Sequence, residues 1–151
     1  MKSTTVEEAE SLLANPLQCQ DVGEWKYDRL QPSLAKLECG LIAEDGSRAG
    51  LLVQLLFSRS PKTKLPEYKF TVFKWNHAGL QRVYQLHMNG IARAPKNWHD
   101  FAHEHVGQSR IDGTAEWLKW GFADALDYFC KRTNITFIPP VEDPEVFRLT
   151  P

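Results

Sequence analysis

The spacing of apolar residues in the middle of the chain predicts a first β-hairpin. Residues 34–43 and 50–58 are strand candidates, and residues that favour turns bound both of them. The two candidates are joined across Glu44-Asp45-Gly46-Ser47, in which Asp-Gly is a favoured dipeptide for a type I′ turn. The stretch from Leu51 to Phe57 is almost continuously apolar, which is typical of a central strand.

Residues 67–75 and 80–89 form a second predicted hairpin, which turns at Asn76-His77-Ala78-Gly79. If Trp75 pairs with Leu80, the next pairs fall at positions 73/82, 71/84 and 69/86. Side chains alternate between the two faces of a strand, so one face should mix cations with aromatic rings and the other should meet the core. The mixed face is predicted to carry Lys69, Thr71, Phe73, Arg82 and Tyr84. The core face is predicted to carry Tyr68, Phe70, Val72, Val83, Gln85 and His87.

Helical spacing of apolar residues occurs towards both ends of the chain. Thr5-Val6-Glu7-Glu8 has the form of a capping box and predicts a short helix through about residue 15. Thr114 is the predicted N-cap of a long helix that runs to about Thr133. Residues 90–107 are expected to be irregular, and residues 135–138 are expected to add a short strand. We therefore predict an α+β fold in which an antiparallel sheet of two or more β-hairpins packs against a long C-terminal helix, with a short N-terminal helix.

Length and composition fit one domain over residues 1–151, with 42% apolar and 25% charged residues. The chain has no apolar run of about 18 residues and no apolar signal segment at its start, so we expect a cytoplasmic protein without a membrane partner. The three cysteines are Cys19, Cys39 and Cys130. They are odd in number and form no CxxC pair, so we expect buried thiols in a reducing compartment rather than disulfides or a zinc site.

The net charge of −1 conceals a separation of charge along the chain. Residues 1–45 hold four Lys/Arg against nine Asp/Glu, and residues 97–151 hold five against nine. Residues 46–96 hold nine Lys/Arg against Glu67 alone. Such a basic segment is a candidate surface for phosphate groups.

Lys and Arg neutralise phosphates, and exposed aromatic rings stack on unpaired bases. The residues predicted to bind an RNA substrate are Lys69, Arg82, Arg93 and Arg110. Two other interpretations remain open. Lysines on a sheet often protect its edges from pairing with other chains, and these cations could meet the acidic ends of the same protein.

His99, His103 and His105 form a histidine cluster with Asp100 and Glu104 among them. Histidines two residues apart lie on one side of a strand, and histidines four apart share a helix face. The cluster could therefore bind a metal, supply a general acid and base, or serve only as structure. The sequence contains no HExxH, CxxC, P-loop, GxGxxG or GxSxG motif, which leaves metalloprotease, nucleotide-loop and serine-hydrolase activities without support.

The segments Tyr68–Phe73 and Arg82–Leu86, followed by His103-Glu104-His105-Val106-Gly107, resemble small bacterial domain-of-unknown-function proteins. Some of those proteins are classed as toxin components of toxin–antitoxin modules, and in them a strand pair leads to a loop with a His-x-His step. The resemblance covers residues 66–130. It implies a bacterial or phage origin and a toxin-like role. It marks His103 and His105, and less directly Tyr84 and Arg82.

Our leading hypothesis is a toxin-like, RNA-directed protein that acts as a metal-independent endoribonuclease without a cofactor. His103 and His105 would transfer protons with help from Tyr84, and the predicted cations would hold the phosphate. The partners would be RNA and a cognate antitoxin or another protein. The alternative is a non-enzymatic interaction or regulatory module of bacterial or phage origin, and a third possibility is a small metal-dependent hydrolase.

Overall fold

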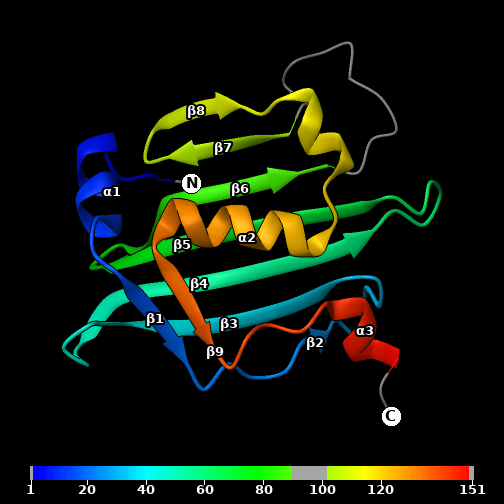
Figure 1. Cartoon of the computed structure of the whole chain (residues 1–151), viewed down its shortest axis with the longest axis horizontal. Coiled ribbons are helices and arrows are strands. Elements are labelled where there is room, and N and C mark those ends of the chain that lie inside the picture. The colour runs from blue at the N-terminus through cyan, green and yellow to red at the C-terminus, as the bar shows by residue number, and fades with distance from the viewer. Residues whose placement is uncertain (1, 90–101, 150–151) are drawn as a thin grey trace.

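The computed structural model describes residues 2–89 and 102–149, which form a large curved sheet with three short α-helices (Figure 1). Within these residues the sheet has nine strands, in the order β8-β7-β6-β5-β4-β3-β1-β9, and β2 pairs with β3. The strands are β1 (Leu17–Gln20), β2 (Lys26–Tyr27), β3 (Ala35–Ala43), β4 (Arg48–Arg59), β5 (Pro66–Asn76), β6 (Gly79–Met88), β7 (His103–Val106), β8 (Ser109–Asp112) and β9 (Ile135–Ile138). The helices are α1 (Val6–Leu13), the 3₁₀-helix η2 (Ala115–Lys119), α2 (Phe122–Thr133) and α3 (Pro144–Leu149).

The predicted fold class is wrong in two respects. The sheet is mixed rather than antiparallel, because β1 and β9 pair in parallel. The long C-terminal helix does not exist, since α2 has only 12 residues. Gly121 is its N-cap, and the side chain of Asp124 accepts a hydrogen bond from the Gly121 N–H at 3.1 Å. This cap separates η2 from α2 and breaks the helix predicted over residues 114–133.

Both predicted hairpins are present, but the register of the second one changes partway along the strands. Trp75 pairs with Leu80 and Phe73 pairs with Arg82, as predicted, whereas Val72 pairs with Tyr84. Val83 is therefore an extra residue on β6, which is the definition of a β-bulge. Because side chains alternate along a strand, one extra residue exchanges the two faces for the rest of β6.

The N-terminal segment continues the sheet beside Arg82. Ser3 forms a parallel bridge with Arg82, whose backbone N–H donates to the Lys2 carbonyl at 3.0 Å. The turn between β7 and β8 closes against the same segment at Gly107, where φ is +55°. A Cβ atom at Gly107 would lie 2.5 Å from the backbone oxygen of Thr5, so the turn and the N-terminal segment fit together only with glycine there.

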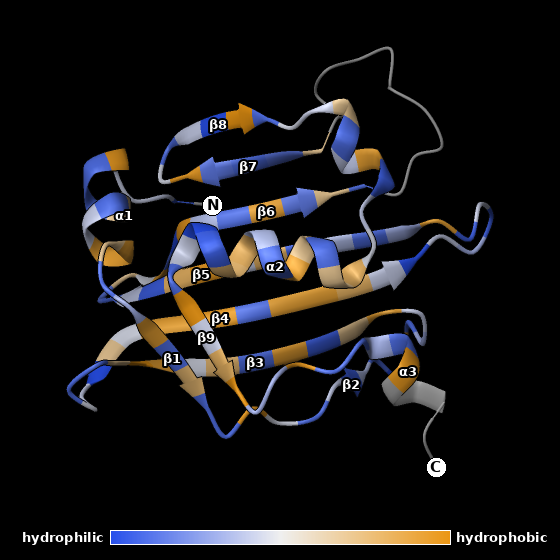
Figure 2. Ribbon diagram, viewed as in Figure 1, coloured by the Kyte–Doolittle hydropathy of each residue, from blue (hydrophilic) through white to orange (hydrophobic). Residues whose placement is uncertain are grey.

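The helix α2 lies across one face of the sheet, which we call the helix-covered face (Figure 1). Phe129 of α2 packs on Phe70 and Tyr84, with 5.7 Å between ring centroids in both pairs. Figure 2 shows hydrophobic segments along β4 and on α2, whereas β7 is mainly hydrophilic. In the described residues no helix packs on the opposite face, which we call the helix-free face (Figure 1). The large cluster of buried apolar residues among the described residues therefore lies on the helix-covered face.

The expectation of three free thiols is also wrong, because Cys19 and Cys39 form a disulfide with 6.1 Å between their Cα atoms. β1 and β3 are neighbours in the sheet although 20 residues separate the two cysteines. Cys130 remains a free thiol, and burial raises its pKa to about 11.

Every helix of the described residues is too short or too polar to cross a lipid bilayer.

Candidate functional site

The His-x-His segment is a strand, not part of the irregular stretch predicted over residues 90–107. Within β7 the side chains alternate, so His103 and His105 lie on the helix-free face and Glu104 lies on the helix-covered face. Two histidines at this spacing share one side of a strand, which was one of the two geometries that the sequence left open. His99 of the predicted cluster lies outside the described residues.

A third histidine joins this pair across the sheet. His87 of β6 lies directly opposite His103, and their ring centroids are 5.3 Å apart. The centroids of His103 and His105 are 4.8 Å apart. His87 was predicted for the core face, and the bulge at Val83 places it here instead. We call His87, His103 and His105 the imidazole row.

The members of the imidazole row differ in their exposure to solvent. His103, in the middle, is buried, and His105 is half-buried. Burial, followed by the positive charges of Arg82, His103, Arg110 and His87, lowers the pKa of His105 from 6.5 to about 4. His105 is therefore neutral at physiological pH and presents a basic nitrogen. The described residues contain no group of three or more ligands arranged to hold a metal ion.

Polar side chains surround the imidazole row on the helix-free face. Gln85 lies opposite His105, and its Nε2 donates to Thr71 Oγ1 at 2.9 Å. Glu67 Oε1 lies 3.0 Å from His87 Nε2, and this hydrogen bond lowers the pKa of Glu67, which keeps its carboxyl group ionised. The carboxylate of Glu67 thus restricts the orientation of His87, and Thr71 restricts that of Gln85 beside His105.

Among the charged groups near His105, Arg82 contributes most to lowering its pKa. Its Nη1 lies 3.4 Å from Gln85 Oε1, and its buried Nε has no hydrogen-bond partner among the described residues. No carboxylate contributes to the shift of its pKa, which burial lowers. Arginine remains protonated at any physiological pH, so Arg82 brings a positive charge to the site that no described acid neutralises.

Four other cations lie in two different environments. Lys69 lies opposite His87, and Arg110 lies opposite His105. These two residues, both predicted to bind RNA, therefore lie on the helix-free face. Arg110 also contacts Asp112, with 3.2 Å between Nε and Oδ1. Two others meet the acidic ends of the chain, because Arg59 pairs with Glu145 and Lys74 pairs with Glu8. Arg93 lies outside the described residues.

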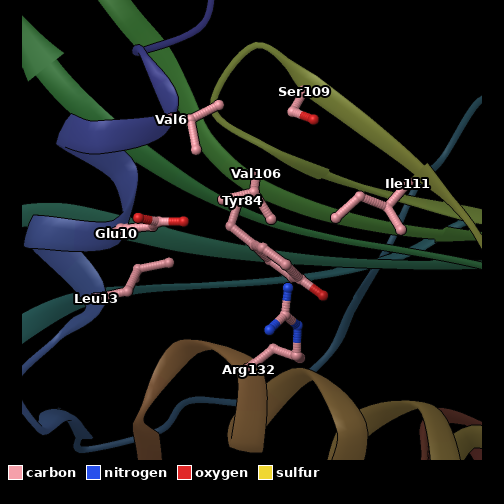
Figure 3. Close-up of a pocket in the computed structure, with 8 residues that line it drawn as sticks. All are labelled: Val6, Glu10, Leu13, Tyr84, Val106, Ser109, Ile111 and Arg132. Atoms are coloured by element: carbon pink, nitrogen blue, oxygen red, sulfur yellow. The ribbon is translucent and has the colours of Figure 1, made fainter.

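Tyr84, predicted to assist catalysis, is on the wrong face for that role. Its partner across the sheet is Val72, and its ring packs on Phe129 of α2. Figure 3 shows the side chain pointing towards Arg132, in a cavity on the helix-covered face. The predicted register would have placed it beside Arg82, and the bulge removes it from the imidazole row.

Sequence reasoning also missed a buried ionic network around Glu104, which is 1% exposed. Arg132 of α2 contacts Glu104 Oε1 through Nε at 2.8 Å and Nη2 at 2.7 Å. The hydroxyl of Tyr128 donates to the other carboxylate oxygen. Tyr128 and Arg132 are four residues apart on one helix face, which is the only sequence signal that could have indicated a shared partner.

No protein-family model, curated protein or solved structure matches this chain.

Proposed function

We propose that the protein acts on RNA through the imidazole row, as a toxin-like endoribonuclease that requires no metal ion. One observation carries this proposal: the row lies beside Arg82, a cation that no carboxylate of the described residues neutralises. Imidazoles transfer protons near neutral pH, and a guanidinium stabilises the charge that develops on a phosphoryl group. These are the two requirements of RNA cleavage without metal.

Other groups on the same face suit a single-stranded substrate. Lys69 and Arg110 add positive charge on either side of the row. Trp75 is 59% exposed and shares this face with Phe73, two residues away on β5. An exposed indole stacks on an unpaired base, so we assign Trp75 to base binding and the cations to the backbone.

The proposed reaction moves two protons. His105 removes the proton from a ribose 2′-hydroxyl, whose oxygen attacks the adjacent phosphorus. The bond from phosphorus to the 5′-oxygen breaks, and His103, entering the step protonated, donates a proton to that oxygen. Arg82 stabilises the charge on the phosphorane, and the products are a 2′,3′-cyclic phosphate and a free 5′-hydroxyl.

The low pKa of His105 is consistent with a base that becomes effective when substrate binds. Burial is the first cause of the shift, and the nearby cations are the second. A phosphodiester bound against Arg82 and Arg110 carries the opposite charge, so it raises the pKa of His105 towards neutrality. Base catalysis is most effective when that pKa lies near the working pH.

The test is cleavage of a labelled single-stranded RNA oligonucleotide in the presence of EDTA. We expect cleavage with a 2′,3′-cyclic phosphate on the product, and none of an oligonucleotide with 2′-deoxy sugars. His105→Ala and His103→Ala should each lower kcat by about 10²- to 10⁴-fold. Arg82→Ala should weaken binding and reduce the slope of log affinity against log salt by about 1.

His77 provides the matched control, because it is an exposed histidine in the turn between β5 and β6. His77→Ala should cleave RNA as the parent protein does. Binding of intact RNA without cleavage would reject the nuclease and favour the non-enzymatic interaction module. Cleavage that survives in His103→Ala and His105→Ala alike would assign the activity elsewhere.

A further inference from the structure

The strand β8 is the last strand of the sheet, and its outer edge pairs with no other strand of the described residues (Figure 1). All four of its residues are exposed. One of them is Ile111, a large apolar side chain that is 44% exposed. An edge strand presents a row of backbone groups to which a further strand can bind. The outer edge of β8 is therefore a candidate surface for a protein partner.

The backbone groups of Arg110 and Asp112 are the ones that point away from β7. The N–H of Gly113 donates to the Ala102 carbonyl at 2.8 Å, so this pair across the two strands is hydrogen-bonded. Hydrogen-bonded and non-hydrogen-bonded pairs alternate along an antiparallel ladder. Ile111 is therefore hydrogen-bonded to β7, whereas Arg110 and Asp112 are not. A strand added at this edge would bind to the backbone of Arg110 and Asp112.

The side chains of these two residues carry opposite charges on one face. Arg110 lies opposite His105 and Asp112 lies opposite His103, so both side chains are on the helix-free face. Arg110 Nε lies 3.2 Å from Asp112 Oδ1. A second copy of β8 running antiparallel could place arginine opposite arginine, aspartate opposite aspartate, or each opposite the other. Like charges directly opposite destabilise a sheet and unlike charges stabilise it, so the third register is favoured.

We propose that two copies of the protein pair through β8 about a twofold axis, with Arg110 of each copy opposite the partner's Asp112. The four charges then form a square in which neighbouring charges have opposite sign. Ile111 lies opposite the partner's Ile111, so the two exposed apolar side chains cover each other on the helix-covered face. The two sheets become one continuous sheet, and both imidazole rows lie on the same side of it.

Charged residues on an edge strand often prevent pairing with other chains. Such protection requires a charge that a second copy of the same edge repels, as a lone lysine does. In β8 a cation and an anion lie two residues apart, and reversal of the strand places each one opposite its counterpart. The charges therefore favour an antiparallel second copy. Because the strand is short, we expect a weak dimer with a Kd on the order of 10⁻⁴ M.

The experiment is disulfide crosslinking of the full chain through one new cysteine, in a Cys130→Ser background and with oxidised glutathione. In the proposed register Ile111 and its copy form a non-hydrogen-bonded pair, with about 4.5 Å between Cα atoms, which a disulfide can span. Ile111→Cys should therefore give a covalent dimer. Ser109→Cys is the matched control on the same strand and face. It should remain monomeric, because the two copies of Ser109 would be about 14 Å apart.

Charge exchange tests the register itself. In the Ile111→Cys protein, Arg110→Asp places two aspartates opposite each other and should lower the yield of dimer about fivefold or more. Adding Asp112→Arg restores opposite charges and should restore the yield.

Sedimentation of the parent protein should show a dimer fraction that rises with concentration around 10⁻⁴ M, as estimated from the size of the contact. A parent protein that stays monomeric up to about ten times that concentration would overturn the proposal. Equal crosslinking of Ile111→Cys and Ser109→Cys would also overturn it, as would an Arg110→Asp variant that crosslinks as well as the exchanged pair. RNA is absent from these measurements, so their outcome is independent of the proposed nuclease activity.

Discussion

The two faces of β7 show how neighbouring residues in one strand acquire opposite chemistry. Glu104 points to the helix-covered face, where Arg132 and Tyr128 satisfy both carboxylate oxygens. His103 and His105, one residue away on either side, point to the helix-free face beside a guanidinium that no described acid neutralises. The buried charge on the first face is compensated, whereas Arg82 on the second face has no carboxylate partner among the described residues. A buried charge without a partner destabilises a fold, so uncompensated charge persists where a ligand can use it.

The largest expected effect comes from breaking the compensated face. Arg132→Ala leaves Glu104 buried without its cation, and removing one partner of a buried pair costs about 3–5 kcal/mol in the free energy of unfolding. Because the Arg132 side chain is 42% exposed, we expect a value near the lower end, about 3 kcal/mol. Urea denaturation measures the difference.

The neighbouring residue on the same helix supplies the control for this variant. Lys131 pairs with Asp127 at 2.9 Å on the exposed side of α2. Such pairs contribute about 0.3–0.5 kcal/mol, so Lys131→Ala should hardly change the unfolding curve. Equal losses in the two variants would mean that Glu104 is not the buried, compensated charge described here.

The second-largest expected effect is a loss of stability that leaves the chemistry of both faces of β7 unchanged. The disulfide between Cys19 and Cys39 closes a loop of about 20 residues at the other end of the sheet from β7. Replacing both cysteines with serine should lower the free energy of unfolding by about 3 kcal/mol, because a loop of this length gains that much freedom in the unfolded chain. RNA cleavage at a temperature where the variant remains folded should not change.

Cys130 is the control for the disulfide, since it is a free thiol. Cys130→Ser should leave the loop closed and have a much smaller effect on unfolding. Thiol titration of the denatured parent protein should count one reactive thiol without reductant and three with it. Three thiols in both conditions would mean that the disulfide is absent, as the spacing of the cysteines in the sequence predicted.

The sequence was sufficient to predict features that depend on neighbours along the chain. Both hairpins, the helix capped by Thr5 and the short strand after Asn134 are all present in the structure. Each follows from local signals, such as a turn dipeptide, a capping residue or a residue that accepts the left-handed conformation. The strand β7 was missed, because residues 90–107 were expected to be irregular, although the rule that places His103 and His105 on one side of a strand applies once the strand is known.

The failures concern features that depend on distant parts of the chain. The bulge at Val83 coincides with the place where the N-terminal segment pairs with Arg82, and no local pattern indicates that partner. This single residue moved Tyr84 and His87 to the faces opposite those predicted. The pairing of Cys19 with Cys39 likewise depends on β1 lying beside β3. Gly121 was a local signal for a helix boundary. The helical spacing of apolar residues on both sides of it was the stronger pattern, and it led to the prediction of one long helix.

The smallest effect tests the helix-free face through pH. His105 has a pKa of about 4 in the folded protein and an ordinary value of 6.5, so between these limits the unfolded chain binds a proton that the folded protein does not. Stability from this group is therefore complete above pH 6.5 and is lost as the pH falls towards 4. Because His105 is half-buried, solvent screening limits the loss to about 1 kcal/mol. In His105→Asn, the free energy of unfolding should fall less between pH 7 and pH 5 than in the parent protein. His77→Asn removes an exposed histidine and should follow the parent curve. A curve for His105→Asn that matches the parent would mean that neither burial nor the cations of the helix-free face lower the pKa of His105, and the contrast between the two faces of β7 would lose its electrostatic basis.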